Sequence, residues 1–167
     1  MSYNHVRVYC GDGHGKSNAA IGQCIKYASV GKEVIIVQFL KGSNVDELAC
    51  LKRLEPEIRL FRFESNAEAY TDLSKEEQMA EDANIHNGLN YVKKVLVTGE
   101  CDLLVIDEIL GLVDHHIIEM EDVIRLLEMK DDEMEVILTG RNMPLQLTPY
   151  VSDVFEIRTV KMTEEDS

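Results

Sequence analysis

Short apolar runs alternate along the chain with longer segments whose apolar residues recur every three or four positions. The short runs predict β-strands at residues 6–10, 33–40, 58–63, 103–106, 135–139 and 153–157. The second run is nearly continuous in β-forming residues, which is typical of a strand buried on both faces of a parallel sheet. The third run alternates between apolar and polar residues, as a strand at the edge of a sheet does.

The longer segments predict helices that connect these strands. They lie at residues 17–30, 45–55, 72–98, 110–114, 119–129 and 145–151. Gly31 and Gly99 directly follow two of them, in the position where glycine commonly ends a helix. Because strands joined by helical crossovers run parallel, we expect a three-layer α/β fold with a mainly parallel sheet.

A glycine-rich loop joins the first predicted strand to the first predicted helix. Its residues are Gly11, Asp12, Gly13, His14, Gly15, Lys16, Ser17 and Asn18. Glycines let successive backbone N–H groups turn toward phosphate oxygens, and the following helix directs the positive end of its dipole to the same place. Lys16 would reach the outer phosphates, and the Ser17 hydroxyl would bind a magnesium ion carried by them. The stretch therefore predicts a nucleotide-binding P-loop.

The loop departs from the strict P-loop spacing at one position. The strict pattern would need a glycine at Cys10, whereas the first glycine here is Gly11. The alternative interpretation is a glycine-rich turn that happens to precede a lysine. The β-branched strand before the loop and the Ala-rich helix after it favour phosphate binding.

Charge and cysteine content narrow the classes of partner. The chain has 167 residues, of which 17 are basic and 31 acidic, so its formal net charge is −14. This balance argues against a nucleic acid held over a broad surface, although it is compatible with a local phosphate site. The four cysteines are scattered and form no Cys-x-x-Cys pair, which is typical of reduced thiols and not of a disulfide framework or a zinc site.

Polar side chains follow several predicted strands, where folds of this class bind their ligands. Asp107 and Glu108 follow an apolar strand and predict a pair that holds magnesium, the alternative being that they only cap the next helix. Arg141 follows another strand and could reach a phosphate, although alone it would be an ordinary surface arginine. Gln38 and Lys41 lie at the end of the second strand, where a solvated position is as good an interpretation as a site role.

Four motifs together resemble the ATP:corrinoid adenosyltransferases of the P-loop type, which adenosylate cobalamin precursors. They are Gly-Asp-Gly-His-Gly-Lys-Ser at residues 11–17, Gln-Phe-Leu-Lys-Gly at 38–42, Leu-Val-Ile-Asp-Glu at 104–108 and Ile-Leu-Thr-Gly-Arg-Asn at 137–142. The resemblance implies a RecA-like homodimer that binds ATP with Mg²⁺, in an orientation reversed relative to most P-loop proteins. It also implies a corrinoid as second substrate, adenosylated at its reduced cobalt while triphosphate leaves.

Site roles follow from the resemblance by position. Residues 11–18 would bind ATP, and Ser17, Asp107 and Glu108 would hold Mg²⁺. Lys16 and Arg141 directly, and Glu108 through the magnesium ion that it holds, would stabilise the charge that develops on the departing triphosphate. The protein need supply no covalent residue, because the reduced corrinoid is itself the nucleophile.

Residues 64–72 stand where the family has its corrinoid-facing loop. Tyr70 is the only aromatic residue of this polar stretch, and the chain has no tryptophan. We therefore expect the segment to be mobile without a second substrate. We also expect a preference for corrinoids whose lower ligand is already detached or lacking.

Residues 1–162 are predicted to form a single P-loop nucleotide-binding domain and residues 163–167 an acidic tail. We expect a cytoplasmic protein, since Met1 to Asn4 lack the features of a signal peptide and no apolar run is long enough to cross a membrane. A kinase or ATPase of the same fold, which would release ADP, and a non-catalytic ATP-binding relative both stay open.

Overall fold

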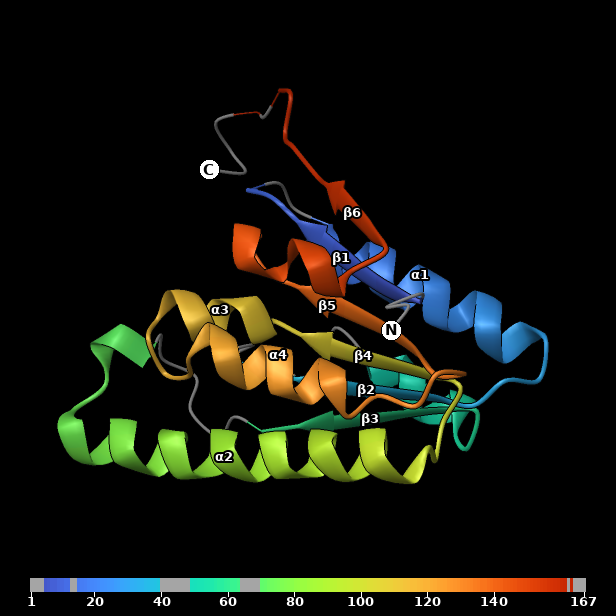
Figure 1. Cartoon of the computed structure of the whole chain (residues 1–167), viewed down its shortest axis with the longest axis horizontal. Coiled ribbons are helices and arrows are strands. Elements are labelled where there is room, and N and C mark those ends of the chain that lie inside the picture. Colours follow the sequence, from blue (N-terminus) through green and yellow to red (C-terminus); the bar gives the residue numbers. More distant parts are fainter. Residues whose placement is uncertain (1–4, 13–14, 40–48, 64–69, 162, 164–167) are drawn as a thin grey trace.

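The structure of the protein is a computed structural model that describes residues 5–12, 15–39, 49–63, 70–161 and 163. Its centre is a sheet of six strands in the order β3-β2-β4-β5-β1-β6 (Figure 1). The strands are β1 (Val6–Cys10), β2 (Val34–Gln38), β3 (Ile58–Arg62), β4 (Leu103–Asp107), β5 (Glu135–Thr139) and β6 (Asp153–Glu156). Every neighbouring pair runs parallel. The predicted α/β fold is confirmed, and β3 lies at an edge as expected.

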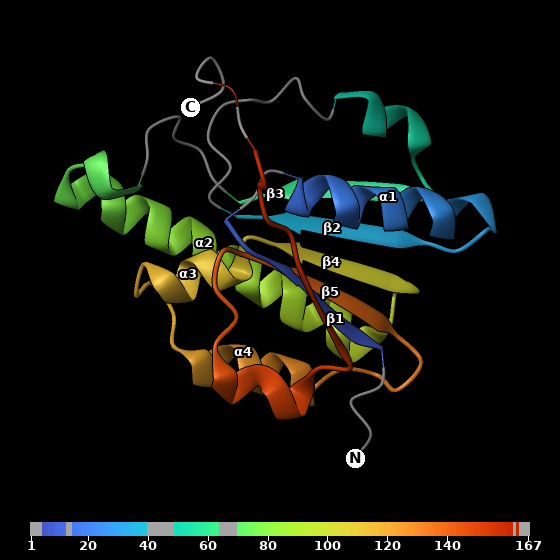
Figure 2. The same cartoon turned by 90° about the horizontal axis from the view of Figure 1, so that it is seen from above.

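Helices cover both faces of this sheet. They are α1 (Lys16–Ser29), α2 (Lys75–Thr98), α3 (Ile109–Asp114) and α4 (Met120–Glu128), with 3₁₀ turns η1 (Ala49–Leu54), η2 (Tyr70–Asp72) and η3 (Leu145–Tyr150). α1 lies on one face, and α2 and α4 lie on the opposite one (Figure 2). Each face carries its own hydrophobic core, because β2 and β4 are buried along their whole length and contribute side chains to both.

Two predicted helices differ from the observed elements for identifiable reasons. The longest helix begins at Lys75 instead of Asp72, because the Ser74 hydroxyl accepts a hydrogen bond from the Glu77 N–H and the Glu77 carboxylate accepts one from the Ser74 N–H. This reciprocal pair fixes the helix start. Residues 145–151 form a 3₁₀ turn, in which Pro149 provides no N–H for an α-helical hydrogen bond.

The predicted helix at 45–55 is described only in part. Its last residues form the 3₁₀ turn η1, and residues 45–48 lie outside the described part of the chain. Among the helices that the structure describes, none combines the length and apolar character that a bilayer crossing requires.

Candidate functional site

The glycine-rich loop leaves the carboxyl end of β1 and enters α1. Gly11 has a φ of 119° and donates its N–H to the Arg141 carbonyl oxygen at 2.9 Å. A Cβ atom at Gly11 would overlap the backbone carbonyl of Ile157, so this position requires glycine on steric grounds as well. Gly15, at a φ of 104°, precedes α1, and its carbonyl accepts the Ala19 N–H.

The remaining predicted loop residues divide by exposure. Lys16 and Ser17 form the first turn of α1 and are half-buried, whereas Asp12 and Asn18 are exposed. Gly13 and His14 lie outside the described residues. The two half-buried residues are the ones to which the sequence assigns phosphate and metal contacts.

Asp107, the last residue of β4, connects the loop to the sheet. The carboxylate is 1% exposed and accepts the Ser17 hydroxyl at 3.0 and 3.2 Å from its two oxygens. The Thr139 hydroxyl, at the end of β5, donates to the same carboxylate at 2.6 Å. Because β4 and β5 pair side by side, their carboxyl ends bring these oxygens together beneath the start of α1.

Glu108 turns the chain sharply away from β4. It has a φ of 65°, and its N–H donates to the Thr139 hydroxyl at 2.8 Å. Glu108 occupies the residue before α3, yet its side chain makes no capping hydrogen bond to that helix. The geometry thus does not favour the interpretation of Asp107 and Glu108 as a simple helix cap.

Gln38 and Arg62 extend the group of polar side chains across two more strands. The Gln38 amide is 2% exposed, and its Nε2 donates to Asp107 at 3.2 Å while its Oε1 accepts from the Arg62 Nε at 3.0 Å. Gln38 lies opposite both residues in the sheet register. The sequence left Gln38 undecided and gave no role to Arg62 or Thr139, although each is a polar residue at the carboxyl end of a strand.

Arg141 lies at the same edge but outside this hydrogen-bonded group. Its side chain is exposed, and it lines an open pocket of about 430 Å³. The other lining residues are Cys10, Gly11, Asn142, Met143, Val154 and Glu156. Burial and the neighbouring Glu156 carboxylate raise the pKa of the Cys10 thiol, while the Lys16 ammonium lowers it.

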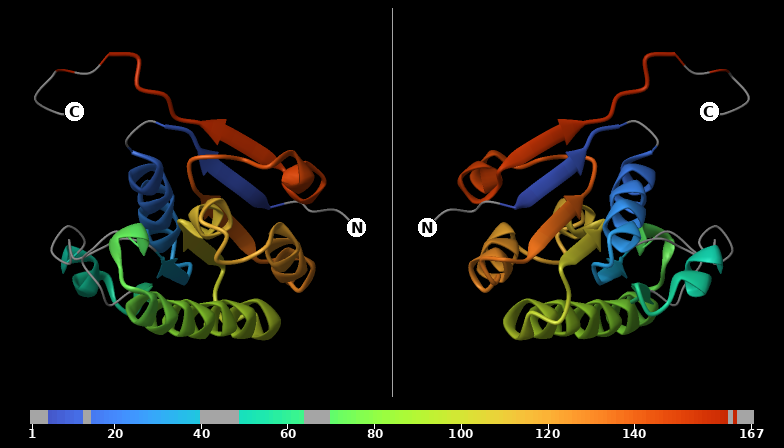
Figure 3. Two further views of the ribbon diagram at one scale, coloured as in Figure 1. Left: turned by 90° about the vertical axis from the view of Figure 1, so that its left-hand side faces the viewer. Right: turned by 90° about the vertical axis from the view of Figure 1, so that its right-hand side faces the viewer.

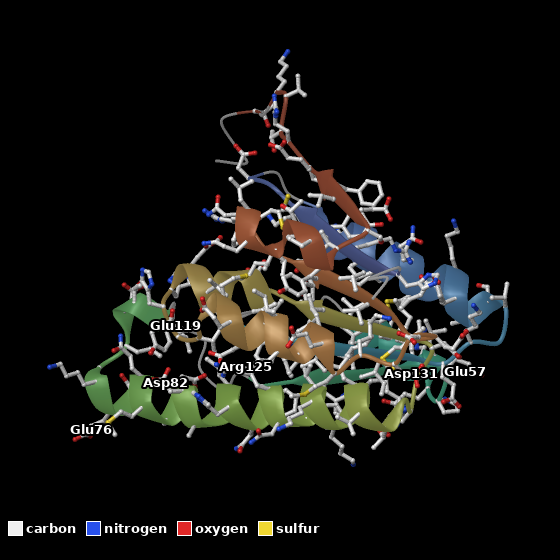
Figure 4. The ribbon with its side chains drawn as sticks, viewed as in Figure 1. Glu57, Glu76, Asp82, Glu119, Arg125 and Asp131 are labelled. Atoms are coloured by element: carbon white, nitrogen blue, oxygen red, sulfur yellow. The ribbon has the colours of Figure 1, made fainter. Side chains whose placement is uncertain are left out.

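The segment predicted to face a corrinoid is described only at its end. Residues 64–69 lie outside the described part, so the mobility expected of residues 64–72 stays a prediction. Tyr70 follows them in η2 and donates its hydroxyl at 2.7 Å to Asp82. Figure 4 labels Asp82 on α2. Burial and Asp82 together raise the pKa of Tyr70 to about 12, so the ring is held on α2 as a neutral phenol.

A model of the family described as ATP:corrinoid adenosyltransferase BtuR/CobO/CobP matches residues 3–166. The chain belongs to this family. The resemblance inferred from the four motifs is confirmed, and it extends over nearly the whole sequence.

Curated relatives carry matching names. The chain is 27% identical over 156 residues to the corrinoid adenosyltransferase of Escherichia coli strain K12 and 29% identical over 156 residues to corrinoid adenosyltransferase CobA of Salmonella typhimurium. Each alignment covers 93% of this chain and 77% of the relative.

A solved structure supports the fold independently. A KaiC-like protein from Pyrococcus horikoshii OT3 superposes with a TM-score of 0.59 and 18% identity, covering 95% of this chain and 74% of that one. At this identity the likeness bears on the fold alone, and it agrees with the predicted RecA-like P-loop architecture.

Proposed function

We propose that this chain transfers the 5′-deoxyadenosyl group of ATP to a reduced corrinoid and releases triphosphate. The observation that carries the proposal is the contact between Ser17 and Asp107 beside the glycine-rich loop, in a member of this family. That contact brings the first turn of α1 to the end of β4, at the edge where ligands of α/β sheets bind.

The reaction balances without a covalent intermediate on the protein. The electron pair on the reduced cobalt forms the bond to the ATP 5′ carbon, and the carbon–oxygen bond breaks with its pair left on the triphosphate. The chain must align the two reactants and stabilise the negative charge that appears on the leaving group. Lys16, the loop N–H groups and Arg141 supply positive charge and donors for this purpose.

The side chains present fit a magnesium ion. Ser17 offers a hydroxyl oxygen and Asp107 a carboxylate 3.0 Å from it, and hard oxygen donors of this kind are the ones that Mg²⁺ prefers. Ser17, Asp107 and Glu108 would hold the ion, which when bound supplies charge neutralisation on the phosphates. Thr139 and Gln38 orient the Asp107 carboxylate from the sheet side.

Replacing Gln38 by methionine tests this orienting role. The variant keeps the side-chain length but removes the hydrogen bonds to Asp107 and Arg62, so we expect about a tenfold rise in the Mg²⁺ concentration needed for half-maximal ATP binding. Calorimetric titration of the ATP complex at increasing Mg²⁺ measures the change. Gln23→Met on α1 is the matched control, because Gln23 contacts Arg7 and not this group. An identical Mg²⁺ dependence in Gln38→Met and wild type would remove Gln38 from the site.

Further parts of the proposal concern organisation and partners. We propose that residues 1–162 act as one nucleotide-binding domain, that two copies form a homodimer, and that the protein works in the cytoplasm. The family resemblance supports the homodimer and a reversed orientation of ATP. The formal net charge of −14 speaks against a nucleic-acid partner.

Product analysis distinguishes the proposal from its alternatives. With ATP, Mg²⁺ and a chemically prereduced corrinoid, adenosyl transfer yields triphosphate and a carbon–cobalt bond. A kinase or ATPase would yield ADP instead, and a binding protein would yield neither product. Prereduction is needed because residues 64–72 contain a single aromatic residue, so that we expect little help from the protein in detaching the lower ligand of an intact cofactor.

A further inference from the structure

The strand β6 ends the sheet and is exposed along its whole length. It pairs with β1 on one side, and it is the last strand in the sheet order (Figure 3). Val154 is 46% and Phe155 45% exposed, although the Phe155 ring stacks on Tyr9 at 5.1 Å. An edge strand of this kind offers a row of backbone donors and acceptors to a further strand.

The backbone directions show which residues could accept such a strand. The Ile157 N–H donates toward β1, to the Cys10 carbonyl oxygen at 2.7 Å. Because successive residues of an extended chain direct their N–H and C=O groups to opposite sides, the backbone groups of Glu156 and Arg158 point away from β1. If two copies pair antiparallel about Ile157, Glu156 of one copy and Arg158 of the other would face each other and exchange two backbone hydrogen bonds.

The sequence around Ile157 is complementary to itself when reversed. An antiparallel pairing of two copies about Ile157, the residue that follows β6, puts Glu156 opposite Arg158. Cross-strand pairs of opposite charge stabilise a sheet, so this pair favours the register.

Neighbouring registers lack this complementarity. Centring the pairing on Glu156 places two Glu156 carboxylates opposite each other, and centring it on Arg158 does the same with two guanidinium groups. Like charges directly opposite destabilise a pair of strands. Within one copy Arg158 already lies 3.6 Å from Glu156, so both charges occupy one face of the strand and are available to a partner there.

We propose that β6 and the residues directly after it, 157–159, form the edge through which two copies of this chain associate, in antiparallel register about Ile157. The inference rests on the proposed homodimer and adds the surface and register through which it forms. A two-fold axis through Ile157 would join the two sheets into one continuous sheet. Because of this symmetry, each favourable cross-strand pair would occur twice.

Charge reversal tests the register without relying on loss of folding. Glu156→Arg gives a copy with two arginines beside Ile157, and Arg158→Glu gives a copy with two glutamates. We expect each variant alone to dimerise about tenfold more weakly than wild type, because both cross-strand ion pairs become like-charge pairs. Mixing the two variants restores opposite charges at both positions and should recover a mixed dimer. The double variant Glu156→Arg/Arg158→Glu should regain wild-type dimerisation.

Sedimentation equilibrium over a concentration series measures these constants, and thermal unfolding checks that each variant is folded. Glu121→Arg, at an exposed position on α4, is the control for an equal change of net charge. A wild type that stays monomeric would overturn the homodimer together with this inference. A dimer as strong in both single variants as in wild type, or a mixture that gains nothing, would overturn the β6 interface and leave the homodimer standing.

Discussion

Replacing Lys16 by alanine is expected to abolish tight binding of MgATP and to leave the fold intact. Lys16 begins α1 at a half-buried position, directly after the glycine-rich loop. Losing one preorganised charged donor costs about 3 kcal/mol at comparable sites, which corresponds to roughly a hundredfold weaker binding or slower reaction. Isothermal titration with MgATP measures the affinity.

The control for Lys16→Ala comes from the same helix. Lys26 lies exposed in the last turn of α1, so Lys26→Ala removes the same charge at the far end of the helix. We expect its MgATP affinity to match wild type. Equal affinity in Lys16→Ala and Lys26→Ala would show that the glycine-rich loop does not bind the triphosphate.

Replacing Asp107 by alanine is expected to have the second large effect, on both stability and magnesium dependence. The buried carboxylate accepts hydrogen bonds from Ser17, Thr139 and Gln38. Without the carboxylate these donors lose their acceptor in the protein interior. Leaving one buried donor without an acceptor costs about 1–3 kcal/mol, so the free energy of unfolding should fall by about 3 kcal/mol. The affinity for ATP should also become nearly independent of Mg²⁺, since the carboxylate ligand is gone.

Chemical denaturation and Mg²⁺ titration measure the two effects of Asp107→Ala. Asp102→Ala provides the control, because Asp102 precedes the opposite end of β4 and its exposed carboxylate accepts the Glu33 N–H. That variant should lose about 1 kcal/mol of stability and keep the magnesium dependence. An Asp107→Ala protein with wild-type stability would contradict the network, and an unchanged Mg²⁺ titration would remove Asp107 from the metal site.

Local signals in the sequence were sufficient to predict most of the fold. Gly31 and Gly99 adopt positive φ angles of 81° and 62° after α1 and α2, as their positions implied. The buried β-branched runs predicted the four inner strands β1, β2, β4 and β5 to within two residues, because a strand covered on both faces needs continuous apolar character. Helix starts were harder to predict than strands. The capping pair of Ser74 and Glu77 decides where α2 begins, although the residues before it, from Asp72, are also compatible with a helix.

Residues of the candidate site could be predicted only where they belong to a recognisable motif or directly follow a predicted strand. Ser17 and Asp107 were assigned from a loop and a strand end, and the structure brings them to 3.0 Å. The roles of Gln38 and Arg62 depend on β2 lying between β3 and β4, so that Gln38 faces both Arg62 and Asp107. Strand order is set by packing of the whole sheet, and no local pattern in the sequence encodes it.

The most direct test of the proposed function is the ratio of two products in one reaction. ATP, Mg²⁺ and prereduced corrinoid are incubated with the protein, and triphosphate is quantified by ion-exchange chromatography beside the adenosylated corrinoid from its absorbance spectrum. The account predicts one triphosphate for each carbon–cobalt bond, no ADP, and loss of both products in Lys16→Ala. ADP and phosphate as the only products, or no adenosylated corrinoid with prereduced substrate, would contradict it.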